Sequence, residues 1–387
     1  MRIGIDYTSA VHQKAGIGRY TRGLVKALAK LESGHEYVLI MTGGGDQGPE
    51  APVGDLASRL PSNFQIKRVP FSDRFWAVVW HRVRLPLPLD LFTGSVQLFH
   101  SPDYVLPPLR SGKKVVTIHD LSFLRYPEGA EPSLRRYLER AVPNAVERAD
   151  LVLADSQNTK GDIVELLGAP PEKVEVLFPG VDERFRPLED EQLLEKTRTL
   201  YDLSFPFILF VGTLEPRKNL ARLLDAYATL RMLGEISHRL VIAGGTGWLY
   251  EGIFRRAEEL SLGSDVIFLG YVGDENLPAL HNLADLFVFP SVYEGFGLPP
   301  LEAMACGTPV IASDSSSLPE VVGEAGLMVP SDDQEALAEA MRRVLSDAAL
   351  REDLVSRGLR QASRFTWKRA GQQMLTTYER LLDLPQG

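Results

Sequence analysis

The sequence predicts an α/β fold made of two Rossmann-like, doubly wound domains with parallel sheets. Three observations support this prediction. Short apolar runs alternate with helical stretches along the whole chain, the alternation stops once near residue 180, and glycines and charged residues directly follow several runs. In open parallel sheets, ligands bind beyond the carboxyl ends of the strands. We therefore expect the two domains to face one another across a ligand-binding cleft.

Strand-like runs mark the predicted strands on both sides of the interruption. In the first half they are Ile3–Ile5, Tyr37–Met41, Gln65–Val69, Leu98–His100, Lys114–Ile118, Leu151–Ala154 and Val174–Phe178. In the second half they are Phe207–Val211, Leu240–Ala243, Val266–Leu269, Leu286–Phe289, Pro309–Ala312 and Gly326–Val329.

The interruption lies in P-G-V-D-E-R-F-R-P-L, from Pro179 to Leu188. This stretch combines two prolines, a glycine and clustered charge, without helical or strand periodicity. We expect a first domain over 1–182 and a second over 183–364. The remaining residues, 365–387, have helical spacing from Phe365 to Leu382 and predict a final helix.

Composition excludes several classes of protein. The formal net charge of −9 argues against a nucleic-acid binder, which needs a broad basic face. Cys306 is the only cysteine, so no internal disulfide can form, as suits a reducing cytoplasm. Met1 leads directly into a strand, and no apolar stretch reaches the roughly 20 residues that span a bilayer. We expect a cytoplasmic protein.

The run E-G-F-G-L-P-P-L-E, from Glu294 to Glu302, is predicted to join a buried strand to a helix that begins near Pro299. Gly295 and Gly297 allow a ligand to approach the main chain, and the amides at a helix start attract an anion. Glu302 lies about 5 Å further along the helix axis, where it could reach the hydroxyls of a ribose. This pattern predicts a site for a phosphorylated sugar.

Arg217 and Lys218 follow the predicted strand Phe207–Val211 and open the next helix. A helix start already favours negative charge, so two cations there need another reason, and an anionic ligand would supply it. An exposed charge pair is the other explanation. Thr213 either caps this helix or touches the phosphate, and the sequence leaves both roles open.

Four segments together resemble the retaining GT-B glycosyltransferases of sequence family four, in their mannosyltransferase-like branch. They are the Glu294–Glu302 pair, R-I-G-I-D followed by A-G-I-G-R-Y near the start, V-T-I-H-D ending at Asp120, and V-G-T-L-E-P-R-K-N from Val211 to Asn219. The resemblance covers the whole chain and implies a GT-B fold. It also implies that the first domain faces the acceptor, that the second binds the donor, and that the last helix crosses back to the first.

The resemblance implies a role for each candidate residue. Glu294 and His119 would be catalytic and lie near the hexose, and Gly16 would offer its amide to the donor phosphate. The backbone at Val272 would hold the nucleotide base. The full expected donor-binding set is Gly16, Thr213, Arg217, Lys218, Val272, Gly295, Phe296, Gly297, Leu298 and Glu302. Where many relatives have a glycine-rich turn, this chain has serines between Ser313 and Ser317.

The expected reaction is transfer of a hexose from a nucleotide diphosphate sugar to a hydroxyl, with retention at the anomeric carbon. GDP-mannose is favoured as donor, and a UDP-hexose stays open. The acceptor could be a lipid-linked saccharide, a free sugar or a small metabolite. A nucleotide-sugar epimerase and a non-catalytic sugar-nucleotide binding protein are the competing interpretations.

We expect no cofactor apart from the nucleotide sugar. The sequence has no D-x-D pair to hold a divalent metal on the diphosphate, and Arg217 and Lys218 would supply positive charge instead. Gly43, Gly45 and Gly48 spell G-x-G-x-x-G, but prolines follow without helical periodicity, so the pattern does not predict NAD binding.

The segment 59–84 is basic and rich in aromatic residues. Either an amphipathic helix packed on its own domain or peripheral contact with an anionic membrane explains the pattern, and packing is favoured. Its basic residues are Arg59, Lys67, Arg68, Arg74, Arg82 and Arg84, against one acid, Asp73.

Overall fold

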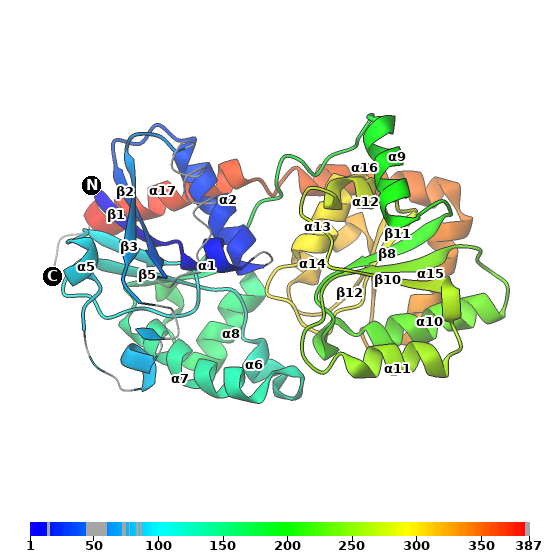
Figure 1. Ribbon diagram of the computed structural model, residues 1–387, viewed down its shortest axis with the longest axis horizontal. Helices are drawn as coiled ribbons and strands as arrows, with labels where there is room; N and C mark the ends of the chain where they lie inside the picture. Colours follow the sequence, from blue (N-terminus) through cyan, green and yellow to red (C-terminus); the bar gives the residue numbers. More distant parts are fainter. Residues whose placement is uncertain are drawn as a thin grey trace. The chain divides into compact units, whose positions relative to one another are not determined.

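The structure is a computed structural model, and it describes residues 1–13, 16–43, 60–71, 75, 76, 78–82, 85 and 87–383. The chain forms two compact units, each built on a parallel sheet (Figure 1). The first unit contains Met1–Leu121, Ser133–Gly180 and Trp367–Gly387, and the second contains Ser122–Pro132 and Val181–Thr366.

The sheet of the first unit has the strand order β3-β2-β1-β4-β5-β6-β7, and all its pairings are parallel. The order reverses direction between β1 and β4, which brings the carboxyl ends of these strands together. The strands are β1 (Arg2–Asp6), β2 (Glu36–Thr42), β3 (Phe64–Val69), β4 (Leu98–Ser101), β5 (Lys113–Ile118), β6 (Leu151–Ala154) and β7 (Val174–Val176).

Helices α2 (Ile17–Ala29) and α17 (Trp367–Asp383) lie side by side in the first unit, drawn in blue and red in Figure 1. They approach closely, since a Cβ added at Gly371 would stand 2.9 Å from Cβ of Ala27. Their apolar faces join those of the strands in one buried core. Within its described residues, the unit also has α1 (Thr8–His12), α5 (Asp90–Thr93), α7 (Pro132–Arg148) and α8 (Gln157–Leu167).

The sheet of the second unit has the order β10-β9-β8-β11-β12-β13, again with parallel pairings. Its order reverses between β8 and β11. The strands are β8 (Phe207–Val211), β9 (Arg239–Ala243), β10 (Val266–Gly270), β11 (Leu286–Phe289), β12 (Val310–Ser313) and β13 (Leu327–Val329). The helices are α6 (Ser122–Arg125), α9 (Glu191–Tyr201), α10 (Leu220–Met232), α11 (Glu251–Glu259), α12 (Leu277–Leu283), α13 (Leu298–Ala305), α14 (Leu318–Val321), α15 (Gln334–Ser346) and α16 (Ala348–Ala362).

Every strand predicted from the sequence is present. Runs such as Phe207–Val211 and Leu286–Phe289 are apolar throughout and buried on both faces, which is a strong signal, whereas β3 is an edge strand with Lys67 and Arg68 exposed. Two features differ from expectation. The short helix α1 lies between β1 and the Gly16 turn. The segment Ser122–Pro132, expected in the first domain, belongs to the second unit, where Trp248 Nε1 donates a hydrogen bond to the carbonyl oxygen of Gly129.

The basic, aromatic segment is described only in part. Arg59, Asp73, Arg74, Arg84 and the Arg82 side chain lie outside the described residues. Within the described part, Trp76 is buried and donates from Nε1 to the carbonyl oxygen of Pro70 at 2.7 Å, while Phe71 and Phe75 are exposed. No helix in the described ranges is long and apolar enough to cross a membrane.

Candidate active site

The reversal of strand order in the second unit brings two site loops together. Strand β11 pairs with β8, so the loops that leave their carboxyl ends are neighbours. Val292 donates its backbone N–H to the carbonyl oxygen of Arg217 at 2.9 Å, which joins the loops directly. Asn219, at φ 57°, donates from its side chain to the carbonyl oxygens of Pro290 and Ser331.

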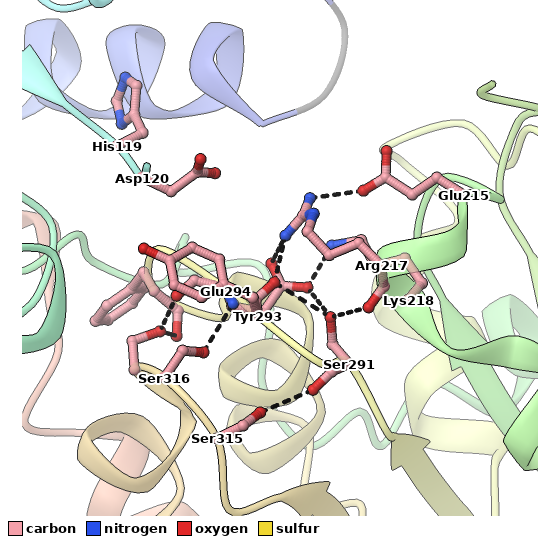
Figure 2. A network of polar contacts seen from close by, with 12 residues as sticks. His119, Asp120, Glu215, Arg217, Lys218, Ser291, Tyr293, Glu294, Ser315 and Ser316 are labelled. Carbon is pink, nitrogen blue, oxygen red and sulfur yellow. Dashed lines mark hydrogen bonds and ion pairs between the residues drawn. The ribbon is translucent and has the colours of Figure 1, made fainter. Parts of the chain in front are cut away.

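Glu294 lies at the centre of this junction, between two cations (Figure 2). Lys218 Nζ is 2.5 Å from Glu294 Oε1, and Arg217 Nη1 is 3.1 Å from Oε2. Ser291 Oγ also donates to Oε1, at 2.5 Å. Arg217 is held from its other side by Glu215, whose Oε1 is 2.6 Å from Nη2. All four charged side chains are therefore engaged with one another.

The cations keep Glu294 ionised although it is only 7% exposed. Burial alone would raise the pKa of its carboxyl. The charges of Arg217 and Lys218, with hydrogen bonds from Lys218 and Ser291, outweigh burial and lower the pKa to about 2. Glu294 is thus a carboxylate at any physiological pH, able to accept hydrogen bonds and to stabilise developing positive charge.

The structure refines the prediction for Arg217 and Lys218. They lie in a 3₁₀ turn, Pro216–Lys218, and α10 begins after them at Leu220. Lys218 is buried, so the alternative interpretation of Arg217 and Lys218 as an exposed charge pair is wrong for Lys218. Glu215 and Glu294 already supply the negative charge that was expected from a ligand.

Helix α13 begins at Leu298, one residue before the predicted start, and Gly297 precedes it at φ 116°. A Cβ at Gly297 would stand 2.8 Å from Leu318 Cδ2, so glycine is required there for both backbone angle and space. Because Pro299 and Pro300 have no N–H, the amides of Gly297 and Leu298 are the donors that this helix start presents to an anion. Glu302, in the same helix, is 1% exposed.

Four serines, at the end of β12 and in the turn after it, hold the Glu294 loop in place. Ser313 and Ser315 donate to the carbonyl oxygen of Ser291, and Ser317 donates to those of Glu294 and Phe296. Ser316 Oγ accepts the backbone N–H of Glu294 at 2.8 Å, and Ser316 itself has a φ of 51°. This serine turn therefore holds the loop that carries the central carboxylate (Figure 2).

The remaining donor-site candidates of the second unit lie at the same edge of its sheet. Thr213 lies in the loop after β8. Val272 lies in the loop after β10, which ends at Gly270 with a φ of 68°. Val272 and Phe296 are buried, whereas Tyr271 is exposed. Gly295 lies between Glu294 and Phe296 in the braced loop. The structure thus places all of them at the carboxyl ends of the strands, as the sequence predicted.

The first unit carries the other two candidates. Gly16 immediately precedes α2 and has a φ of 51°, and its carbonyl oxygen accepts from Tyr20 N–H at 3.0 Å. His119 follows β5, and its Nδ1 lies 2.7 Å from Asp155 Oδ2. Its Nε2 lies 2.9 Å from the carbonyl oxygen of Pro102. Both ring nitrogens are therefore bonded within the unit.

Sequence reasoning missed Asp155, Ser291 and Ser316. Asp155 directly follows the strand Leu151–Ala154, so the same strand-end rule that selected His119 would have found it. The two serines had no comparable signal, because their importance depends on which loops become neighbours. Among the described residues, no group of three or more His, Cys, Asp or Glu side chains is placed to hold a metal ion.

Two family models match the chain, each over one half. Residues 15–185 match the model described as Glycosyltransferase Family 4, and residues 195–361 match Glycosyl transferases group 1. The chain is also 33% identical over 380 residues to the O-antigen chain mannosyltransferase B of Escherichia coli, covering 95% of this chain and 96% of that protein. The chain belongs to the group 1 glycosyltransferases. It is therefore a glycosyltransferase and resembles the mannosyltransferase-like branch.

Other relatives share the fold or part of the sequence. The D-inositol 3-phosphate glycosyltransferase of Corynebacterium urealyticum is 31% identical over 336 residues, which cover 78% of each chain. The solved structure of sucrose-phosphate synthase from Thermosynechococcus elongatus superposes with a TM-score of 0.77 at 24% identity, over 98% of this chain and 99% of that one. This likeness confirms the predicted GT-B fold.

Proposed function

We propose that this glycosyltransferase moves mannose from GDP-mannose to a hydroxyl group, with retention of configuration and without a metal ion. The observation that carries the proposal is the cluster of Arg217, Lys218 and Glu294 at the start of α13. It combines two cations for a diphosphate with a permanent carboxylate for the sugar. The mannosyltransferase relative supports mannose as the hexose.

The reacting bond joins the anomeric carbon to a phosphate oxygen. As it breaks, negative charge grows on the diphosphate, where Arg217, Lys218 and the amides of Gly297 and Leu298 stabilise it. Positive charge grows on the sugar ring, and the Glu294 carboxylate, whose pKa is about 2, stabilises it and accepts a sugar hydroxyl. Glu302 accepts the ribose hydroxyls.

Retention is proposed to follow from attack on the same face. The acceptor oxygen bonds to the anomeric carbon as the phosphate leaves, and the leaving phosphate oxygen takes the acceptor's proton. A covalent intermediate would need two carboxylates about 5 Å apart at the anomeric carbon. In this proposal Glu294 binds the hexose and Glu302 binds the ribose, so no second carboxylate lies at the anomeric carbon. Arg217 and Lys218 replace the metal ion as the source of positive charge.

Further contacts are part of the proposal. Gly16 and His119 contact the donor, Thr213 contacts the phosphate, and the backbone at Val272 holds the base. The acceptor is a saccharide, either free or lipid-linked, or a small metabolite. The protein is proposed to work in the cytoplasm, and packing of the 59–84 segment on its own domain stays favoured over peripheral membrane contact.

A UDP-hexose is the second candidate donor, because a base held by the backbone at Val272 leaves no side-chain record of its identity. Calorimetry with GDP-mannose, GDP, UDP-glucose and UDP separates the two, because the base contacts are independent of the transfer step. The preferred donor is then incubated with a panel of saccharide acceptors. Free nucleotide with a new glycoside supports the proposal, whereas an isomerised nucleotide sugar indicates an epimerase.

The variant that tests the role of Glu294 in this reaction is Glu294→Ala. Turnover is expected to fall by about a hundredfold or more, since one transition-state electrostatic contact is lost, while nucleotide binding persists. Turnover equal to that of the wild type would remove Glu294 from the mechanism.

A further inference from the structure

His119 and Asp155 form a buried pair at the carboxyl ends of neighbouring strands. Ile118 of β5 pairs with Ala154 of β6, so the next residue on each strand lies beside the other. His119 and Asp155 are 8% and 5% exposed, which shields the 2.7 Å contact between Nδ1 and Oδ2 from water. Asp155 Oδ1 has no hydrogen-bond partner within the described part of the chain, so His119 is the main partner of this carboxylate.

Both ring nitrogens of His119 face groups that accept hydrogen bonds. The carbonyl oxygen of Pro102 has no proton to give, so Nε2 must donate to it. Asp155 accepts from Nδ1 as a carboxylate; burial raises the pKa of its carboxyl, and the charge and hydrogen bond of His119 act in the opposite direction. A ring that donates from both nitrogens is an imidazolium and has no lone pair with which to accept a proton.

Two acids support this charge. Burial alone would lower the pKa of His119, but the charge and hydrogen bond of Asp155, the Pro102 carbonyl and the charge of Asp103 raise it to about 9. Asp103 lies in the loop after β4, and Asp155 lies after β6, so the ring has a carboxylate on each flanking strand.

Three uncharged side chains also lie near the ring. Tyr20 of α2 and the loop residue Tyr104 pack edge-on against it, with ring centroids at 4.8 and 5.6 Å. His100 on β4 is neutral, since burial and then the charge of His119 lower its pKa to about 3. Asp120, the next residue along the chain, adds a further acid at this edge of the sheet.

We propose that Asp155 is a positioning residue for hexosyl transfer. It fixes His119 as a doubly protonated ring that donates from both nitrogens, and so prevents His119 from acting as the general base. This inference rests on the proposed function, in which His119 contacts the donor. The bond from the anomeric carbon to phosphate breaks as the new bond to the acceptor oxygen forms. The acceptor's proton passes to the leaving phosphate oxygen, and the proton count of His119 stays constant.

The test is a pH titration of His119 by NMR with isotope-labelled histidine, in which the signal is identified from its loss in His119→Gln. In the wild type, the His119 signal is expected to stay that of an imidazolium from pH 6 to 8. In Asp155→Asn, the ring loses its counter-charge but remains buried, so its titration should move to pH 6.5 or below. Asp162→Asn is the control, because Asp162 is equally buried in the same unit and its carboxylate accepts from Asn158.

Activity gives a second measure. The pH dependence of kcat/KM should show no ionisation of His119 between pH 6 and 8 in the wild type and in Asp162→Asn. In Asp155→Asn, the pH profile of kcat/KM should gain an ionisation at the new pKa of His119, because the ring then changes its protonation state within the assayed range. A structural role alone would lower activity equally at every pH.

Either of two results would overturn the inference. One is a wild-type His119 that titrates near pH 6.5, a result that does not depend on the Asp155→Asn variant. The other is an Asp155→Asn enzyme whose pH profile has the wild-type shape. Failure of the proposed function is distinct from both, because it appears as no transfer from any nucleotide sugar while the NMR titration can still be read.

Discussion

Replacing Glu294 by glutamine is expected to tighten the binding of a free nucleoside diphosphate while it lowers turnover. In the structure, Glu294 engages the two cations that a diphosphate needs, through contacts of 2.5 and 3.1 Å. The four charged side chains of the cluster sum to zero, since Arg217 and Lys218 are balanced by Glu215 and Glu294. The diphosphate must therefore compete with an anion that the protein itself supplies.

The size of the effect follows from Coulomb's law. A phosphate bound to the same cations would stand about 6 Å from the carboxylate, where two unit charges repel by about 3 kcal/mol at an effective dielectric constant near 20. Rearrangement of the carboxylate relieves part of this repulsion. We expect a net gain of about 1 to 2 kcal/mol, which corresponds to a Kd roughly 5 to 30 times lower.

The assay is isothermal titration calorimetry with GDP and with UDP, at about 50 and 500 mM salt, because screening should reduce the gain. Glu215→Gln is the matched control, since it removes the same charge from Arg217 but keeps the contact between Lys218 and Glu294. Its gain should be smaller. A folded Glu294→Gln protein that binds both nucleotides as weakly as the wild type, or more weakly, would refute the competition.

Three further predictions concern stability, each measured by urea unfolding. Gly297→Ala should lower the free energy of unfolding by about 2 kcal/mol or more, since φ is 116° and the new Cβ would stand 2.8 Å from Leu318 Cδ2. Gly245→Ala is the control and should leave stability nearly unchanged, because nothing lies within 4 Å of the added Cβ. Ser316→Ala should be about 0.5 to 1 kcal/mol less stable than Ser316→Gly. Both variants lose the hydrogen bond to the backbone N–H of Glu294, but only glycine adopts a φ of 51° without strain. The opposite order of stability would show that the backbone at Ser316 is not strained. The folded pKa of Glu294 is depressed from 4.5 to about 2, so its contribution, up to about 3 kcal/mol, is present above pH 4.5 and lost as pH falls through 2. The stability difference between the wild type and Glu294→Gln should shrink over that window, and a constant difference would contradict the cause given for the shift.

The sequence was sufficient for the strands and for the loops that carry the site. Runs such as Phe207–Val211 and Leu286–Phe289 are apolar at every position because both faces of the sheet are covered. Residues that directly follow such runs must lie at the carboxyl edge of the sheet. Glu294, Lys218 and His119 could be selected for this reason, without knowledge of any contact.

The partners of these residues could not be predicted in the same way. The contact between Lys218 and Glu294 depends on β8 and β11 being neighbours, and local periodicity does not encode strand order. For the same reason the sequence suggested an anionic ligand for cations that already have carboxylate partners. Ser316 is a similar case, because its hydrogen bond to Glu294 joins residues on two separate loops.

The most direct test of the proposed chemistry is the anomeric configuration of the product, measured by NMR after incubation with GDP-mannose and an acceptor. We expect release of GDP matched by a new mannoside with the configuration of the donor, and loss of both in Glu294→Ala. An inverted glycoside, or no binding or turnover of any nucleotide sugar, would contradict the proposal.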